Sequence, residues 1–224
     1  MIERVIADRP GKLLRAVAML GVLVAGVATG AMAQDFPARP IHMVIGFAPG
    51  GGGDILGRVI AQKLSERMKI AVPFENRAGA NGIIAAGAVA RARPDGYTLM
   101  LITPSHVLNG VSGQELPYDT LGDFSGITQL ATSTFVLVTG GRLPARTLPE
   151  LVVQLKAAPG KFNFASTGIG GATHLAGQAF LTAAGVRMVH VPYQGVGAVV
   201  TGLRSGEVDA FFGSVVGLNA LSLI

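Results

Sequence analysis

Short apolar runs alternate with amphipathic helical patterns through most of this 224-residue chain. The apolar runs that predict strands are residues 41–47, 71–75, 97–102, 162–165, 188–191 and 208–212. The segments that predict helices are residues 55–68, 83–91, 148–158, 172–184 and 197–203. Such alternation is typical of βαβ units and of a largely parallel sheet. The pattern therefore predicts an α/β fold.

The pattern weakens in the middle of the chain. Residues 106–125 predict a loose connection, and the apolar runs within 127–139 are interrupted by Thr132-Ser133-Thr134. We place a crossover there, which gives a first α/β lobe at residues 34–132 and a second at 133–224. Residues 213–224 carry no charge, so the second lobe is expected to be truncated.

The amino terminus has the organisation of an export signal. Lys12 and Arg15 close a basic region, residues 16–29 are apolar, and Ala31-Met32-Ala33 matches the pattern that signal peptidase reads. The apolar stretch is short for a membrane-spanning helix, so a retained anchor is the weaker alternative. We therefore expect residues 1–33 to be a cleaved signal peptide and the mature protein to be exported and soluble.

Charge and composition exclude several functions. Residues 1–33 hold four basic and two acidic side chains, so their removal lowers the formal net charge from +5 to +3. No run of Lys or Arg follows, which argues against nucleic-acid binding. The chain has no cysteine, and its four histidines do not show metal-ligand spacing. We expect neither a metal nor a cofactor.

Two glycine-rich turns are the main candidates for a binding site. Residues 47–54 (FAPGGGGD) and 166–174 (STGIGGATH) each follow a predicted strand and open a predicted helix. Glycine lets the backbone approach a ligand, and a helix start offers unpaired N–H groups and a positive dipole end. Ligands of open α/β sheets bind at the carboxyl ends of the strands, where both turns lie. The two turns could thus bind an anion across a cleft.

Nucleotide and catalytic motifs are incomplete. The first turn ends in Asp54 where a phosphate loop needs Lys and Ser or Thr, and Gly168-Ile169-Gly170 lacks the third glycine of a dinucleotide fingerprint. No serine stands in a Gly-x-Ser-x-Gly elbow. Two side chains keep alternative roles: Asp54 is an N-cap or a ligand contact, and Tyr193 packs in a loop or forms a pocket wall.

Several motifs together carry a family resemblance. They are the first glycine turn, residues 74–82 (FENRAGANG), 94–99 (PDGYTL), 116–119 (LPYD), 165–168 with 173–177 (ASTG, THLAG), 189–195 (VHVPYQG) and 206–209 (GEVD). Their order and spacing between residues 36 and 212 resemble the substrate-binding receptors of tripartite tricarboxylate transporters, the TctC or Bug family. Each motif is weak by itself, whereas their succession is specific.

The resemblance implies a fold and a function. The fold is the type II periplasmic-binding-protein architecture, with two α/β lobes around a cleft and, in this shorter chain, an incomplete first lobe. The function is capture of a small organic carboxylate in the periplasm by a monomer that delivers it to a two-component membrane permease, without catalysis. The ligand-binding residues implied are Ala48, Pro49, Gly50, Gly51, Gly52, Gly53, Asp54, Ser105, Ser166, Gly168, Gly170, Gly171, Thr173, His174 and Tyr193.

Two alternatives remain at this stage. Because family members are longer, the chain could be a non-functional remnant of such a receptor, with sheet edges and apolar surface left uncovered. An exported α/β hydrolase is the other alternative, and the missing nucleophile elbow disfavours it.

Overall fold

A computed structural model describes residues 35–220, so the predicted signal peptide lies outside the described residues. Contacts divide the chain after Ala38, and the fold below is that of the unit beginning at Arg39. Within the described residues no helix is both long and apolar enough to cross a membrane. The strands are β1 (His42–Ile45), β2 (Phe74–Asn76), β3 (Thr98–Leu101), β4 (Phe135–Thr139), β5 (Asn163–Ser166), β6 (Val189–Pro192) and β7 (Ala210–Ser214). The helices are α2 (Gly52–Met68), the 3-10 turn η1 (Ala80–Gly82), α3 (Ile83–Ala90), α4 (Pro104–Val111), α5 (Leu148–Ala157), α6 (Ala172–Ala184), α7 (Val196–Ser205) and α8 (Val215–Ala220).

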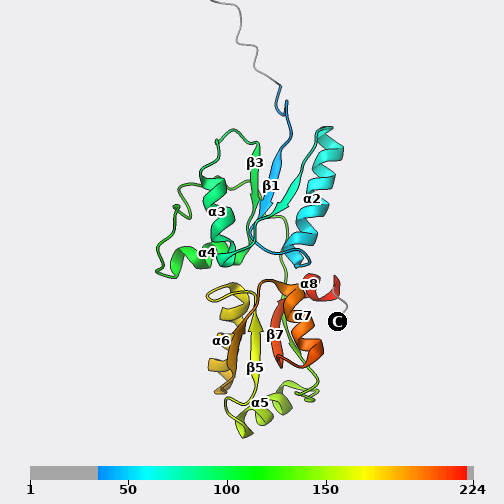
Figure 1. Cartoon of the computed structure of the whole chain (residues 1–224), viewed down its shortest axis with the longest axis vertical. Coiled ribbons are helices and arrows are strands. Elements are labelled where there is room, and N and C mark those ends of the chain that lie inside the picture. The colour runs from blue at the N-terminus through cyan, green and yellow to red at the C-terminus, as the bar shows by residue number, and fades with distance from the viewer. Residues whose placement is uncertain (1–34, 221–224) are drawn as a thin grey trace, which may run out of the picture. The chain divides into compact units, whose positions relative to one another are not determined.

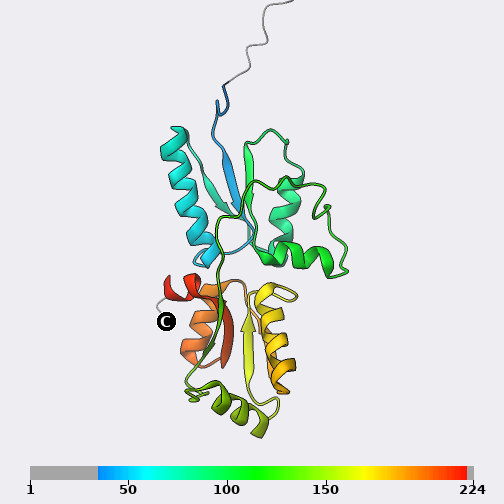
Figure 2. The same cartoon turned by 180° about the vertical axis from the view of Figure 1, so that it is seen from behind.

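The strands form two separate sheets (Figures 1 and 2). The first has the order β2-β1-β3 and is parallel throughout, with Met43 of β1 opposite Phe74 and Leu99. Helix α2 packs on β1 and β2, and α3 packs on β1 and β3. Ile41, Met43, Ala61 and Val72 form the buried centre of this layer. Residues 42–101 thus build one α/β layer from consecutive βαβ units.

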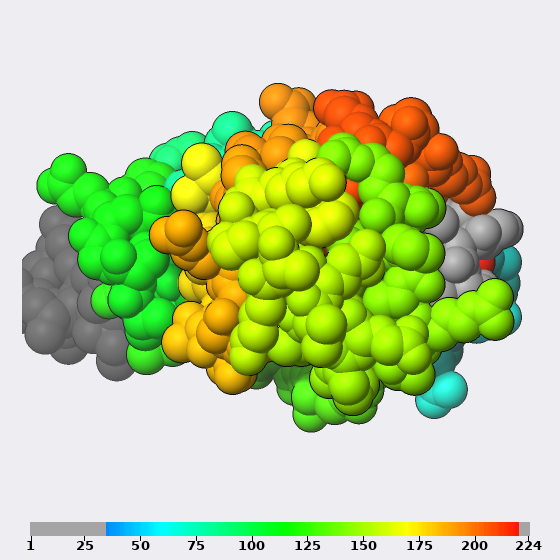
Figure 3. Space-filling view, turned by 90° about the horizontal axis from the view of Figure 1, so that it is seen from below, coloured from blue at the N-terminus to red at the C-terminus, as the bar shows by residue number. Residues whose placement is uncertain are grey.

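The second sheet has the order β4-β7-β5-β6. Its β5–β6 and β5–β7 pairs are parallel, whereas β4 runs antiparallel to β7. Phe164 and Leu155 are fully buried in one core cluster, and Phe211 and Val199 in another. Helix α5 and the turns beside it cover the end of the molecule seen in Figure 3, away from the carboxyl end of β5. The predicted lobe boundary at residue 132 stays a prediction, although it falls between the two sheets.

Most predicted elements are present, and two local predictions were wrong. The stretch from His106 was expected to be loose, but residues 104–111 form α4, with Pro104 at the first turn, where a missing N–H costs nothing. Helix α2 begins at Gly52 rather than Ile55, so Asp54 lies inside the helix and the N-cap is Gly51. Residues 125–134 contain no regular structure, and β4 begins only at Phe135.

Candidate functional site

The first glycine turn follows β1 and leads into α2. Gly50 has a φ of 89°, a conformation that favours glycine, and Gly51 is the extended N-cap without a side-chain capping bond. Helix geometry leaves the N–H groups of Gly52 and Gly53 without an intrahelical acceptor. No other acceptor for them occurs among residues 35–220. The turn therefore presents free backbone donors at the positive end of a helix.

Asp54 holds this turn together from inside the helix. Its carboxylate is 5% exposed and accepts hydrogen bonds from the backbone N–H of Gly50 at 3.0 Å and from Asn76 Nδ2 at 2.8 Å. Arg58, one helical turn on, completes the set with an ion pair at 3.0 Å. Burial alone would raise the pKa of Asp54, but the bonds from Arg58, Gly50 and Asn76 lower it overall. Asp54 is thus an anion whose oxygens serve its own loop.

The second glycine turn is braced by the side chains predicted to contact a ligand. Ser166 is fully buried, and its hydroxyl lies 3.1 Å from the Gly168 N–H and 2.6 Å from His190 Nε2. Thr173 Oγ1 accepts from the backbone N–H of Thr167 at 2.9 Å. These hydroxyls are therefore engaged in shaping the loop, and direct ligand contact by them stays a prediction.

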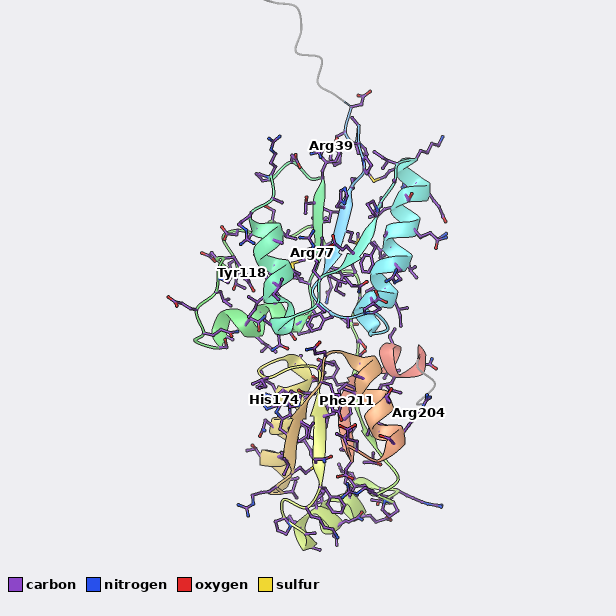
Figure 4. The ribbon with its side chains drawn as sticks, in the orientation of Figure 1. Arg39, Arg77, Tyr118, His174, Arg204 and Phe211 are labelled. Carbon is purple, nitrogen blue, oxygen red and sulfur yellow. The ribbon has the colours of Figure 1, made fainter. Side chains whose placement is uncertain are left out.

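His174 supports the same turn from behind. Its Nδ1 accepts the N–H of Gly170 at 3.1 Å, and its ring stacks on that of His190 with the centroids 4.0 Å apart. Figure 4 shows His174 in the lower α/β layer, on the side where α6 lies. Burial lowers the pKa of both histidines, and the neighbouring His174 lowers that of His190 further. The pair is thus stabilised in its neutral form.

The two glycine turns lie at ends of strands that point toward each other in Figure 1. The Oγ of Ser105, at the start of α4, accepts the N–H of Ala172 at 3.1 Å, and the amide of Asn81 in η1 donates to the carbonyl of Ile169. Helix α8 contacts the start of α2. The structure thus brings the predicted segments 48–54, 105 and 166–174 into one region.

Tyr193 adjoins the second turn through its backbone, whose N–H donates to the carbonyl of Ser166 at 2.8 Å. Its ring packs against the cluster around Val199 and Phe211, and a Cβ on Gly202 would lie 2.7 Å from its hydroxyl. Burial raises the pKa of that hydroxyl. The geometry favours the loop-packing alternative for Tyr193, and its role as a pocket wall stays a prediction.

Asn81 is a residue of this region that sequence reasoning missed. It lies within the motif at residues 74–82, yet its side chain reaches the second glycine turn. Its φ of 52° is unusual for a residue other than glycine, and asparagine is among the few that tolerate it. An asparagine between Gly79 and Gly82 was the available signal, but the sequence pattern does not show where the side chain points.

Two surface hollows lie elsewhere on the first layer. One, of about 400 Å³, is lined by Arg58, Ser65 and Phe74 among others, and the second, of about 370 Å³, lies between α4 and residues 116–121. Neither is lined by the glycine turns. Each turn instead contacts the opposite layer: a Cβ on Gly51 would meet Val196, and the second turn meets Asn81 and Ser105.

Comparisons with known proteins agree with this architecture. BugT of Bordetella pertussis is 37% identical over 202 residues, which are 88% of this chain and 62% of BugT. A Rhodopseudomonas palustris protein, Rpa4515, solved with adipate, matches with a TM-score of 0.81 and 30% identity over 84% of this chain and 63% of its own. MatC from Rhodopseudomonas palustris, solved with bound malate, matches with a TM-score of 0.73 and 28% identity, over 84% of this chain and 64% of MatC.

The chain spans about three fifths of the length of these relatives. Its fold is that of periplasmic solute-binding proteins, with mixed α/β layers. The family model described as Tripartite tricarboxylate transporter family receptor matches residues 56–221. That range begins just after the first glycine turn and covers most of both sheets. The chain therefore belongs to the TctC family of tripartite tricarboxylate transporter receptors.

Proposed function

We propose that this chain binds a small organic carboxylate between its two glycine turns, as the solute-capturing part of a periplasmic receptor. It would act as a monomer and deliver the ligand to a two-component membrane permease. The observation that carries the proposal is that the starts of α2 and α6 both lie where the two layers meet, and that their first-turn N–H groups include free donors. Anions bind readily at such positions because donors and dipole both favour negative charge.

The chemistry of the surrounding side chains supports a ligand bound mainly by backbone groups. Asp54 would repel a carboxylate if its charge were free, but Arg58 and two N–H donors neutralise it locally. Ser105 uses its oxygen as an acceptor for Ala172, so its O–H can still donate to a bound carboxylate. Adipate and malate, the compounds named with two similar structures, are both dicarboxylates.

Gly51→Val tests this proposal without damaging the core. Gly51 has an extended backbone, and a Cβ there would meet only Val196 Cγ2, at 3.6 Å, so the variant is expected to fold. Its branched side chain would stand beside the free donors of α2 and keep a carboxylate away. Isothermal titration with adipate and malate should show binding to the parent chain and at least a tenfold loss in the variant.

Two controls make the titration decisive. Gly126→Val places the same side chain at an exposed glycine with nothing within 4 Å, and should bind like the parent. Dimethyl adipate has the shape of adipate without its charge and should not bind. Binding of adipate by Gly51→Val at parental affinity would contradict the proposed site. A folded parent chain that binds no carboxylate would favour the alternative of a non-functional remnant.

A further inference from the structure

Asn81 occupies a rigid position between the two layers. It lies in η1, which follows β2 after three residues, with φ 52° and ψ 32°. Its backbone carbonyl accepts a hydrogen bond from Asn109 Nδ2 at 3.1 Å, and Asn109 is 2% exposed in α4. The turn that carries Asn81 is therefore tied to a buried side chain and cannot swing freely.

The side chain of Asn81 holds the tip of the second glycine turn. Its Nδ2 donates to the carbonyl of Ile169, and since a carbonyl oxygen only accepts, this partner fixes the orientation of the amide. The side chain of Ile169 is 70% exposed, so the tip gains little from apolar packing. The backbone bond to Asn81 is thus the main contact that holds this tip toward the first layer.

The glycines facing Asn81 fit its amide closely. A Cβ at Gly168 would overlap Asn81 Oδ1, and one at Gly171 would lie 2.7 Å from it. Gly171 has an ordinary extended backbone with φ −73°, so its conformation does not require glycine. The close approach of Asn81 explains why glycine, which has no side chain, occupies position 171.

The side-chain oxygen of Asn81, Oδ1, is buried without a hydrogen-bond donor. Asn81 Oδ1 has no hydrogen-bond partner among the described residues and is shielded from solvent. Its neighbour Gly171 already donates to the Gly168 carbonyl, at 3.4 Å. A buried acceptor left unpaired costs free energy, so the contact must gain more elsewhere.

We propose that Asn81 is a latch: a positioning residue that holds loop 168–171 of the second layer against the first and so slows release of a bound ligand. The inference rests on the proposed function for its ligand, but the latch itself is a contact between two segments of this chain and needs no ligand. Ser105, through Ala172, supplies a second bond beside it. Without Asn81 the loop would keep the bond of Ala172 to Ser105 and its own internal bonds, and it would open more often.

Pulsed electron–electron resonance measures the latch directly. The chain has no cysteine, so Val111→Cys on α4 and Thr182→Cys on α6 give two unique, exposed sites for spin labels. In this background Asn81→Gly removes the amide and keeps a residue that accepts positive φ. The matched control is Ala80→Gly, since Ala80 also has a positive φ, 45°, but an exposed side chain. Asn81→Asp keeps the shape of the side chain and replaces the donor with an oxygen.

In the ligand-free chain, we expect both Asn81 variants to lower the fraction of molecules in which the labels at positions 111 and 182 lie at the shorter distance. Ala80→Gly should match the parent. Stopped-flow kinetics with adipate should show release about fivefold faster, which is the equivalent of roughly 1 kcal/mol, with little change in the association rate. Circular dichroism checks that each variant is folded.

Unchanged label distances in folded Asn81→Gly and Asn81→Asp would overturn the latch. Equal effects of Ala80→Gly and Asn81→Gly would also overturn it, because backbone freedom alone would then explain them. If no variant binds adipate or malate, the proposed function fails, yet the distances in the ligand-free chain still decide whether Asn81 holds the loop.

Discussion

Replacing Asp54 with asparagine separates its role in the loop from a role in ligand contact. The two carboxylate oxygens accept from Gly50 N–H, Asn76 Nδ2 and Arg58. Asparagine has one acceptor oxygen, so it can satisfy either Gly50 or Asn76 and must turn its own N–H₂ group toward the other. Asp54→Asn therefore loses at least one charge-assisted bond and the ion pair.

The cost follows from the burial of each partner. A hydrogen bond to a buried charged group is worth about 1.5–3 kcal/mol. Arg58 is 53% exposed and re-solvates when its partner is lost, so the ion pair adds only about 0.5 kcal/mol. We expect Asp54→Asn to lower the free energy of unfolding by about 2–3 kcal/mol in urea titrations at pH 7. Arg58→Met should cost well under half of that.

Acid provides a second readout. The pKa of Asp54 in the folded chain lies below the ordinary value of 3.8, so its stabilisation is present above that value and disappears as the pH falls through the folded pKa. The parent and Asp54→Asn should therefore converge in stability in strong acid. Glu66→Gln, an exposed change on the same helix, should leave stability within about 0.5 kcal/mol of the parent. A stable Asp54→Asn chain that has lost carboxylate binding would refute the loop role.

Two further predictions concern the second layer. Gly177→Ala should cost about 1–3 kcal/mol in urea unfolding, because its Cβ would collide with the fully buried ring of Phe164; parental stability would show that the core can yield there. The chain should also lose stability as the pH falls below about 6.5, since the unfolded state protonates His174 and His190 before the folded state does. Melting temperatures at pH 7.5 and 5.5 test this, and a His174→Gln/His190→Gln variant that keeps the full pH dependence would contradict it.

Elements with a strong local signal could be predicted from the sequence. Helix α5 begins at Leu148, as predicted, where Thr147 is the N-cap and its side chain accepts from the N–H of Glu150. Helix α6 has the predicted bounds, Ala172–Ala184. Helix α4 was missed because its eight residues include Asn109 and Gly110, which are poor helix formers, and tertiary contacts decide its conformation.

The site was predictable only as backbone segments. Glycine turns after strands indicate where donors can be exposed, and the structure places both turns in one region. Which side chains serve the loops depends on contacts between residues distant in sequence, such as Asp54 with Asn76 and Asn81 with Ile169. No periodicity or motif spacing encodes these directions. The family resemblance assigns His174 and Asp54 to the ligand, which stays a prediction, and both side chains accept hydrogen bonds from their own turns.

Carboxylate binding by the backbone of the two turns is tested most directly by a ¹⁵N–¹H correlation spectrum of the chain titrated with adipate and malate. Backbone N–H groups that bind a carboxylate shift strongly downfield. We expect saturable shifts at Gly52, Gly53 and Thr173, and much smaller ones at Gly126, which is exposed and distant from both turns in the sequence. Saturable binding whose shifts lie away from residues 48–54 and 168–174 would contradict this expectation.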